Sequence, residues 1–373
     1  MKAGIKNFIH LVFSCFLFSC NGEQNYDITH SISDLRLDSI NSELWFSELM
    51  AVNARTMVGM QHKLCLVGPD DYTLTYFIDE QDGQELGYAG VVGEGPEDMQ
   101  PFPIFAGKSE KGDTIYLYDF NAKKMNVYRL TETTEGEPSI KLAYGIKLSN
   151  PNVGRYTSSY MSICRLLNGY YVGLNFLSLS DCFLTLLDKD LKVVKEFGEQ
   201  PLKGLGESGS IKSYRSFDGT LVAHGNSVYY AASKLGYMVR YDITGQGEIT
   251  HQWTHRYADI QYKIVGKQNI KFCPDNLNGF SDMTVGKKFI YATYSGIPMR
   301  VMFEKRSVNA IGARELVVFN HDGEPLGRFK LRSCSFAVGL SEDEEYVYVM
   351  NIDPEVQIER IKVSDIVNVI ENN

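Results

Sequence analysis

Asp113-Thr-Ile-Tyr-Leu-Tyr-Asp-Phe-Asn-Ala-Lys-Lys-Met-Asn-Val-Tyr-Arg-Leu130 is the stretch that decides the fold. Residues 114–118 and 125–130 are rich in aromatic and branched side chains, which favour β-strands. The polar residues between these two runs favour a turn. This stretch therefore predicts a β-hairpin.

Versions of this hairpin recur along the chain at intervals of roughly 50 to 60 residues. The recurring pattern is built on six short apolar runs: residues 64–67, 115–118, 170–174, 228–232, 289–293 and 346–350. A second expected strand follows each run, a third usually comes next, and a fourth precedes the run. This layout predicts an all-β fold, a six-bladed β-propeller with four-stranded antiparallel blades. A pair of β-sandwiches is the alternative, but no Pro- or Ser-rich linker divides the chain.

The last blade of such a ring needs a strand from elsewhere in the chain, because closure removes exposed sheet edges. The tail at 364–370 fits either a strand or a short helix, and residues 28–40 fit a strand that pairs with the last blade. We expect the N-terminal segment to close the ring. The predicted organisation is then a tether with a possible closing strand over 20–40, and the propeller over 41–373.

The first residues of the chain have the pattern of a targeting signal. Lys2 and Lys6 precede an apolar run over 8–18, which is too short to span a bilayer. The run ends in Leu17-Phe18-Ser19-Cys20, which resembles the lipobox of bacterial lipoproteins. The resemblance implies that residues 1–19 are a signal peptide and that Cys20 carries a diacylglycerol. An ordinary secretory peptide is the alternative.

A lipid anchor would hold the protein on a membrane without any contact between the folded domain and lipid. Position 21 is Asn rather than Asp, so no inner-membrane retention signal is evident, and the lipobox resemblance implies attachment to the outer membrane. The net charge of -9 argues against nucleic-acid binding, which needs clustered Lys and Arg. We expect a monomer.

The sequence also resembles one known family. The lipobox, the stretch Gly93-Glu-Gly-Pro-Glu97 with the hairpin after it, and the six-fold layout together resemble the TolB-like six-bladed propeller lipoproteins. In that family the stretch often reads Gly-Pro-Gly-Glu, whereas this chain has Gly95-Pro-Glu-Asp98 and lacks the second Gly. The resemblance implies a location and a fold, and the activity of the family is largely unassigned.

No motif for catalysis or for tight metal binding stands out. The chain has no Cys-x-x-Cys pair, no Gly-x-Ser-x-Gly elbow and no phosphate-binding loop. His251 and His255 fall in an expected strand, where four residues span about 13 Å, too far for one ion. The acidic run 342–345 predicts a solvated loop, with weak calcium binding as the alternative. We therefore expect no catalytic residues, no metal and no cofactor.

One regularity does suggest a binding surface. Arg and Tyr are neighbours at three expected connections between blades, and a fourth loop, 295–314, adds further basic residues. The candidate ligand-binding residues are Arg155, Tyr156, Tyr214, Arg215, Arg256, Tyr257 and Arg300. Arg offers a planar fork for a carboxylate or phosphate, and Tyr offers a ring for stacking on a sugar or peptide. The alternative is that each Arg binds backbone carbonyls and each Tyr packs between blades.

Together these patterns predict a non-catalytic binding or scaffolding lipoprotein that recognises a protein, a peptide or a glycan through the loop face of the propeller. The alternative is a calcium-dependent, lactonase-like hydrolase, or another propeller hydrolase, with a metal in the channel. Its candidate ligands are Asp119, Asn121, Asn175, Asp218, Asn276 and Asp353.

Overall fold

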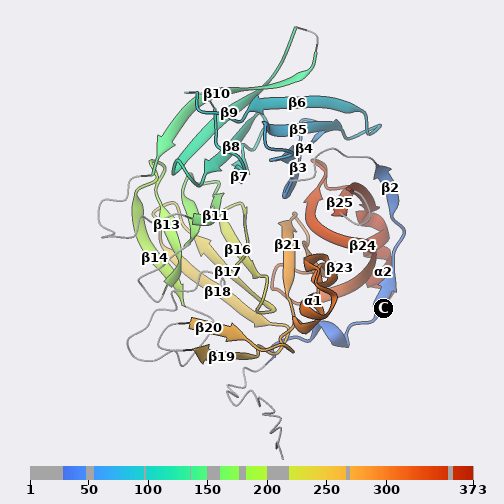
Figure 1. The fold of residues 1–373 in the computed structure, drawn as a ribbon. Helices are drawn as coiled ribbons and strands as arrows, with labels where there is room; N and C mark the ends of the chain where they lie inside the picture. The colour runs from blue at the N-terminus through green and yellow to red at the C-terminus, as the bar shows by residue number, and fades with distance from the viewer. Residues whose placement is uncertain are drawn as a thin grey trace, which may run out of the picture.

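The computed structural model describes residues 28–47, 54–95, 98–134, 136–148, 160–175, 182–199, 218–265, 269–351 and 356–372. These residues form an all-β protein in which twisted sheets stand around a common centre, as Figure 1 shows. The predicted fold class, all-β with a propeller-like arrangement of four-stranded sheets, is confirmed. Cys20 and the rest of the predicted signal peptide lie outside the described residues.

Four sheets each contain four antiparallel strands that follow one another in sequence. The first sheet is β3 (Thr56–Met60), β4 (Lys63–Val67), β5 (Thr73–Asp79) and β6 (Glu85–Val91). The second is β7 (Ile104–Lys108), β8 (Thr114–Asp119), β9 (Lys124–Glu132) and β10 (Pro138–Lys147). The third is β11 (Tyr160–Arg165), β12 (Tyr171–Asn175), β13 (Cys182–Leu187) and β14 (Val193–Glu199). The fourth is β15 (Gly219–His224), β16 (Ser227–Ala232), β17 (Tyr237–Ile243) and β18 (Ile249–Arg256).

The remaining large sheet has eight strands. Its members are β21 (Phe280–Val285), β22 (Ile290–Tyr294), β23 (Ala313–Phe319), β24 (Pro325–Leu340), β25 (Tyr346–Asn351), β26 (Gln357–Lys362), and two N-terminal strands, β1 (Leu37–Ser39) and β2 (Glu43–Phe46). The first half of the 16-residue strand β24 pairs with β23, and the second half pairs with β25. One strand therefore joins two sets of strands without a break.

The N-terminal strands complete this sheet. β2 pairs antiparallel with β26, and β1 pairs in parallel with residues 328–330 of β24. The sequence placed the closing strand within 28–40, but the strand that pairs with β26 is β2, which begins three residues beyond that range, whereas β1, inside it, pairs with the first half of β24. The tail is helical: α2 (Val363–Glu371) follows β26 and buries Ile366 against the sheet.

The hairpin of β8 and β9 shows why the recurring pattern gives this fold. Successive side chains of a strand point to opposite faces. Ile115 and Leu117 belong to the core shared with the first sheet, whereas Tyr116 and Tyr118 belong to the core shared with the third sheet. Full burial of each such side chain contributes about 1.5–3 kcal/mol. Both faces of the hairpin are used for packing between sheets.

Smaller elements of the described structure are the hairpin of β19 (Tyr262–Val265) and β20 (Asn269–Phe272), the short helix α1 (Arg300–Lys305), and two 3-10 helices, η1 (Ile32–Asp34) and η3 (Val308–Ile311). Within the described ranges no helix has the length and apolar character needed to cross a bilayer.

Candidate functional site: the central channel

A channel of about 960 Å³ runs through the centre of the molecule. Six strands contribute to its wall: β3, β7, β11, β15, β21 and the second half of β24. β3, β7, β11 and β15 are each the first strand of a four-stranded sheet, and β21 is the first strand of its edge of the eight-stranded sheet. Most of the six strands lie next to each other in space. The side chains of first strands, rather than those of the buried second strands, therefore decide what the channel can bind.

These six strands run in the same direction along the channel. Near their C-terminal ends, Gly107 of β7 lies against Arg165 of β11, and Gly59 of β3 lies against Ser341, which follows β24. The channel consequently has two different mouths. We call the mouth lined by Arg55, Phe102 and Phe336 the start mouth. We call the mouth lined by Lys108, Arg165, His224, Glu342 and Glu344 the end mouth.

Arg165 is a cation of the end mouth whose orientation is fixed by an aromatic ring. It is the last residue of β11, and its guanidinium carbon lies 4.5 Å from the centre of the Tyr116 ring. No carboxylate of the described residues lies within ion-pair distance of Arg165. Six other arginines do have such a partner: Arg36, Arg240, Arg300, Arg328, Arg332 and Arg360.

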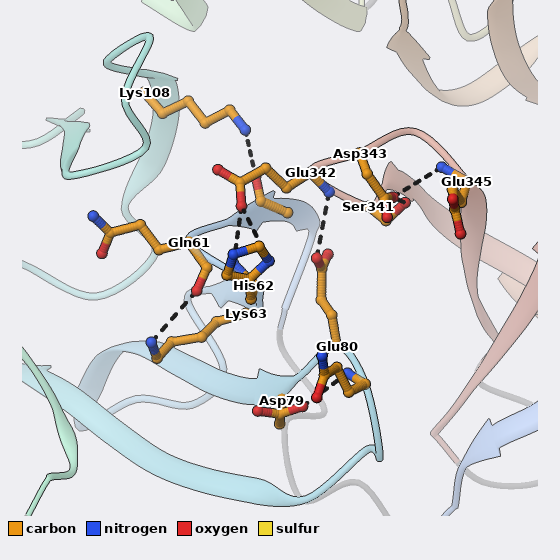
Figure 2. Close-up of polar contacts among 12 residues, drawn as sticks. Gln61, His62, Lys63, Asp79, Glu80, Lys108, Ser341, Glu342, Asp343 and Glu345 are labelled. Carbon is orange, nitrogen blue, oxygen red and sulfur yellow. Dashed lines mark hydrogen bonds and ion pairs between the residues drawn. The ribbon is translucent and has the colours of Figure 1, made fainter.

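The carboxylates at this mouth are engaged by backbone N–H groups (Figure 2). Glu342 accepts a hydrogen bond of 2.9 Å from the N–H of His62, and the N–H of Gln61 also donates to it. Gln61 and His62 both have positive φ, 49° and 58°, so their N–H groups form a concave donor site for an anion. Burial raises the pKa of Glu342, but these hydrogen bonds outweigh it and hold the pKa below its usual value.

Two more polar contacts connect neighbouring strands at the end mouth. Glu344 accepts a hydrogen bond of 2.8 Å from the N–H of Lys287. The ammonium of Lys108 donates to the carbonyl of Gly59, one strand away, and burial lowers its pKa. Side chains of this mouth therefore tie the loop after β24 to the first sheet and to β21.

Glu80 lies beside this network with its carboxyl incompletely satisfied. One oxygen accepts a hydrogen bond of 3.4 Å from the N–H of Glu342. The other oxygen is buried, and no described residue donates to it. Burial raises the pKa of Glu80 to about 7, assisted by the nearby carboxylates of Asp343 and Glu342.

Asp282 is an acidic side chain within the wall of the channel. Its two oxygens accept hydrogen bonds from the N–H of Val338, at 2.9 Å, and from the hydroxyl of Thr220, at 3.2 Å. It thus connects β21 to its neighbours β24 and β15. Burial raises the pKa of Asp282 to about 7, so near neutral pH the carboxyl exchanges between its charged and uncharged forms.

The structure places three of the residues proposed from the sequence. Tyr257 is only 3% exposed; its ring packs on Phe280 and Phe319, and its hydroxyl donates to the carbonyl of Gly323 at 2.7 Å. The ring is therefore unavailable for stacking on a ligand, and Tyr257 packs between sheets. Arg256 ends β18, the strand farthest from the channel in its sheet.

Arg300 begins α1 and forms ion pairs with Asp275 and Glu304 on the surface. Like Arg256 and Tyr257, it lies outside the channel lining. The other proposed residues, Arg155, Tyr156, Tyr214 and Arg215, lie outside the described residues.

The residues considered for calcium are dispersed where the structure describes them. Asp119 accepts hydrogen bonds from the backbone of Gln100 and Ala122 in its turn. Asn175 accepts a hydrogen bond from Thr185, and Asn276 accepts one from the N–H of Gln261 and donates to the carbonyls of Lys234 and Leu277. None of these three, nor Asn121 or Asp218, lines the channel. Asp353 lies outside the described residues, and within the described part no three His, Cys, Asp or Glu side chains form a metal-binding group.

Sequence reasoning missed Arg165, Lys108, Asp282 and the Glu342–Glu80 contact. One signal was present. First strands such as Phe-Ser-Asp-Met-Thr-Val, at 280–285, carry polar residues inside an otherwise apolar run, which indicates a wall that faces water on one side.

Comparisons with known proteins give no family for this chain. No family model matches it, and no curated protein matches it significantly. Among solved structures, it is similar to a Bacteroides fragilis protein named as exported (10% identity, TM-score 0.49, covering 90% of this chain and 96% of that one). It is also similar to hydrazine synthase of Kuenenia stuttgartiensis (10%, 0.47, 85% and 97%). A Lactobacillus plantarum protein is a third (14%, 0.44, 82% and 80%). Because these identities and TM-scores are low, none of the three structures supports an inference about the function of this chain.

Proposed function

We propose that this protein is a membrane-anchored, non-catalytic binding lipoprotein of the TolB-like type, and that it recognises its ligand through the loop face and channel of a six-bladed propeller. The observation that carries the proposal is the channel, whose wall is formed by β3, β7, β11, β15, β21 and the second half of β24. A concave site of this size, with polar groups converging on it, is a common form of ligand site.

The count of six blades depends on β24. The eight-stranded sheet divides into two blades if the first half of β24 is the outer strand of one blade and the second half is the inner strand of the next. The pairing partners support this division, because β23 contacts only the first half and the residue Ser335, whereas β25 pairs with residues 335–340. β2 then supplies the outer strand of the last blade.

The anchor is proposed from the sequence. Leu17-Phe18-Ser19-Cys20 supports lipid attachment at Cys20, and the lipobox supports an outer-membrane location. A diacyl anchor holds a protein stably, because each buried CH₂ contributes roughly 0.8 kcal/mol. Cys15, in the apolar run, is a matched control position.

The anchor is tested by cell fractionation. Cys20→Ala should move the full chain from the membrane fraction to the soluble fraction, whereas Cys15→Ala should leave it on the membrane. Continued membrane association of Cys20→Ala would contradict the lipoprotein proposal.

The binding function is tested with the full mature chain extracted in detergent. Its melting temperature is measured in the presence of peptides, soluble proteins and glycans from the same cell envelope. We expect one class to raise the melting temperature in proportion to the logarithm of its concentration. If no class does so, or if a compound is turned over rather than bound, the non-catalytic binding function is wrong.

A further inference from the structure

We propose that the end mouth of the channel binds the carboxylate of an acidic sugar, and that Arg165 is the residue that holds it. This inference rests on the proposed binding function and adds the chemical class of the ligand. Three features of the described residues lead to it: an oriented guanidinium, a set of carboxylates that are already engaged, and a channel wall with many hydroxyl groups.

The guanidinium of Arg165 is held in an orientation that can bind a planar anion. Stacking 4.5 Å above the Tyr116 ring fixes its plane, and the hydroxyl of Tyr171 accepts a hydrogen bond from one of its N–H groups, which leaves the other N–H groups for a ligand. Tyr171 supports Tyr116 from the side, with 6.5 Å between the two ring centres. A fixed fork without a carboxylate partner among the described residues matches the two oxygens of a ligand carboxylate.

The acidic side chains of the end mouth do not pair with the guanidinium of Arg165. Glu342 and Glu344 accept hydrogen bonds from backbone N–H groups, which anchor them to the protein. The channel lining contains four Lys or Arg side chains and four Asp or Glu side chains, at positions 55, 108, 165 and 287 and at 110, 282, 342 and 344. On a protein with a net charge of -9, this balanced lining is the region where an anion meets less repulsion.

The wall between the two mouths fits a polyhydroxylated ligand. Hydroxyl side chains from four of the six strands line it: Thr56, Ser162, Thr220, Ser281 and Thr284. At the start mouth, Phe336 adds an aromatic ring of the kind on which sugar rings stack. The volume of about 960 Å³ lies at the upper end of small-ligand sites, which favours a mono- or short oligosaccharide over a folded partner.

The test compares two sugars that differ only in the carboxylate. D-Galacturonate and D-galactose are titrated into the full mature chain, and binding is measured by calorimetry at pH 6 and low salt. A charge-assisted, bidentate contact should make galacturonate roughly 10- to 100-fold tighter than galactose. Arg165→Gln should remove this preference, and Arg165→Lys, which keeps the charge without the fork, should retain only part of it.

Arg129→Gln is the matched control, since Arg129 is an exposed arginine of β9 that does not line the channel. It should bind both sugars as the unchanged protein does. Melting temperatures of all variants establish that they are folded. Equal binding of the two sugars, or an unchanged preference in folded Arg165→Gln, would overturn the proposal.

The same measurements separate this inference from the proposed function. If a peptide binds in the channel and neither sugar does, the acidic-sugar proposal is wrong while the binding function stands. If none of the peptides, proteins and glycans binds, both are wrong.

Discussion

Replacing Glu80 by glutamine should stabilise the protein at alkaline pH and leave its stability unchanged under acid conditions. In the folded protein, burial raises the pKa of Glu80 from 4.5 to about 7. A group with a raised folded pKa stabilises the protein only below its unfolded pKa, and this stabilisation is lost as the pH rises through the folded value. Between pH 4.5 and pH 7 the folded carboxyl must therefore lose its proton at a cost in stability.

The size of the effect follows from the pKa difference. A difference of about 2.5 pH units corresponds to about 3.4 kcal/mol. Because the carboxyl is only partly shielded from solvent, we expect about 1–2 kcal/mol. Glutamine is neutral at every pH, and its carbonyl keeps the acceptor that the N–H of Glu342 uses. Glu80→Gln should accordingly have the higher free energy of unfolding at pH 8, and the difference should disappear near pH 4.5.

The assay is urea unfolding followed by tryptophan fluorescence, for both proteins, at several values between pH 4.5 and pH 8. Glu110→Gln is the control, because Glu110 is an exposed residue in the turn between β7 and β8. It should follow the unchanged protein at every pH. A loss of stability in Glu80→Gln at pH 8, or a difference that does not vary with pH, would refute the reasoning.

Two further substitutions test other contacts. Tyr257→Phe removes the hydroxyl that donates to Gly323 and leaves a buried carbonyl unpaired, so the free energy of unfolding should fall by about 1–2 kcal/mol; no loss would show that the hydrogen bond is not needed. Glu342→Gln keeps the shape of the side chain but removes the negative charge that accepts hydrogen bonds from the N–H groups of Gln61 and His62. Thermal unfolding near neutral pH should show a fall of about 1–2 kcal/mol in the free energy of unfolding. This difference from the unchanged protein should become smaller below the pKa of Glu342, where the carboxylate is protonated. A pH-independent loss would contradict the role of that charge.

The periodic pattern of the sequence predicted the strands well, because both faces of the inner hairpins are buried. Residues 115–118 are apolar on both faces of the strand because each face packs against a neighbouring sheet. A continuous apolar run of this kind can be recognised in the sequence. The closing strand Glu43–Phe46 was missed by a few residues for the opposite reason. Two of its four side chains are exposed and the other two are only partly buried, so backbone pairing with β26 leaves little trace in the sequence.

The site was harder to predict, because it depends on contacts between distant parts of the chain. Glu80 and Glu342 meet although 262 residues separate them. Arg165 looks like an ordinary strand end until Tyr116, from another sheet, is placed beneath it. Tyr257 is a residue that the sequence placed wrongly at the surface. Its pairing with Arg256 suggested a binding surface, but its hydroxyl donates to the carbonyl of Gly323 and its ring is buried.

The eight-stranded sheet, which joins N-terminal and C-terminal strands, has a consequence for how the chain folds. Arg360 of β26 binds Glu43 of β2 across 317 residues, and the same sheet contains the first and the last described strands. Synthesis makes β2 early, yet its partner emerges only near the end. Contacts of such long sequence separation slow folding, because a large loop must close before they form. A circular permutant with new ends between β10 and β11 would make this pairing local, and the order in which the sheets assemble would change with it.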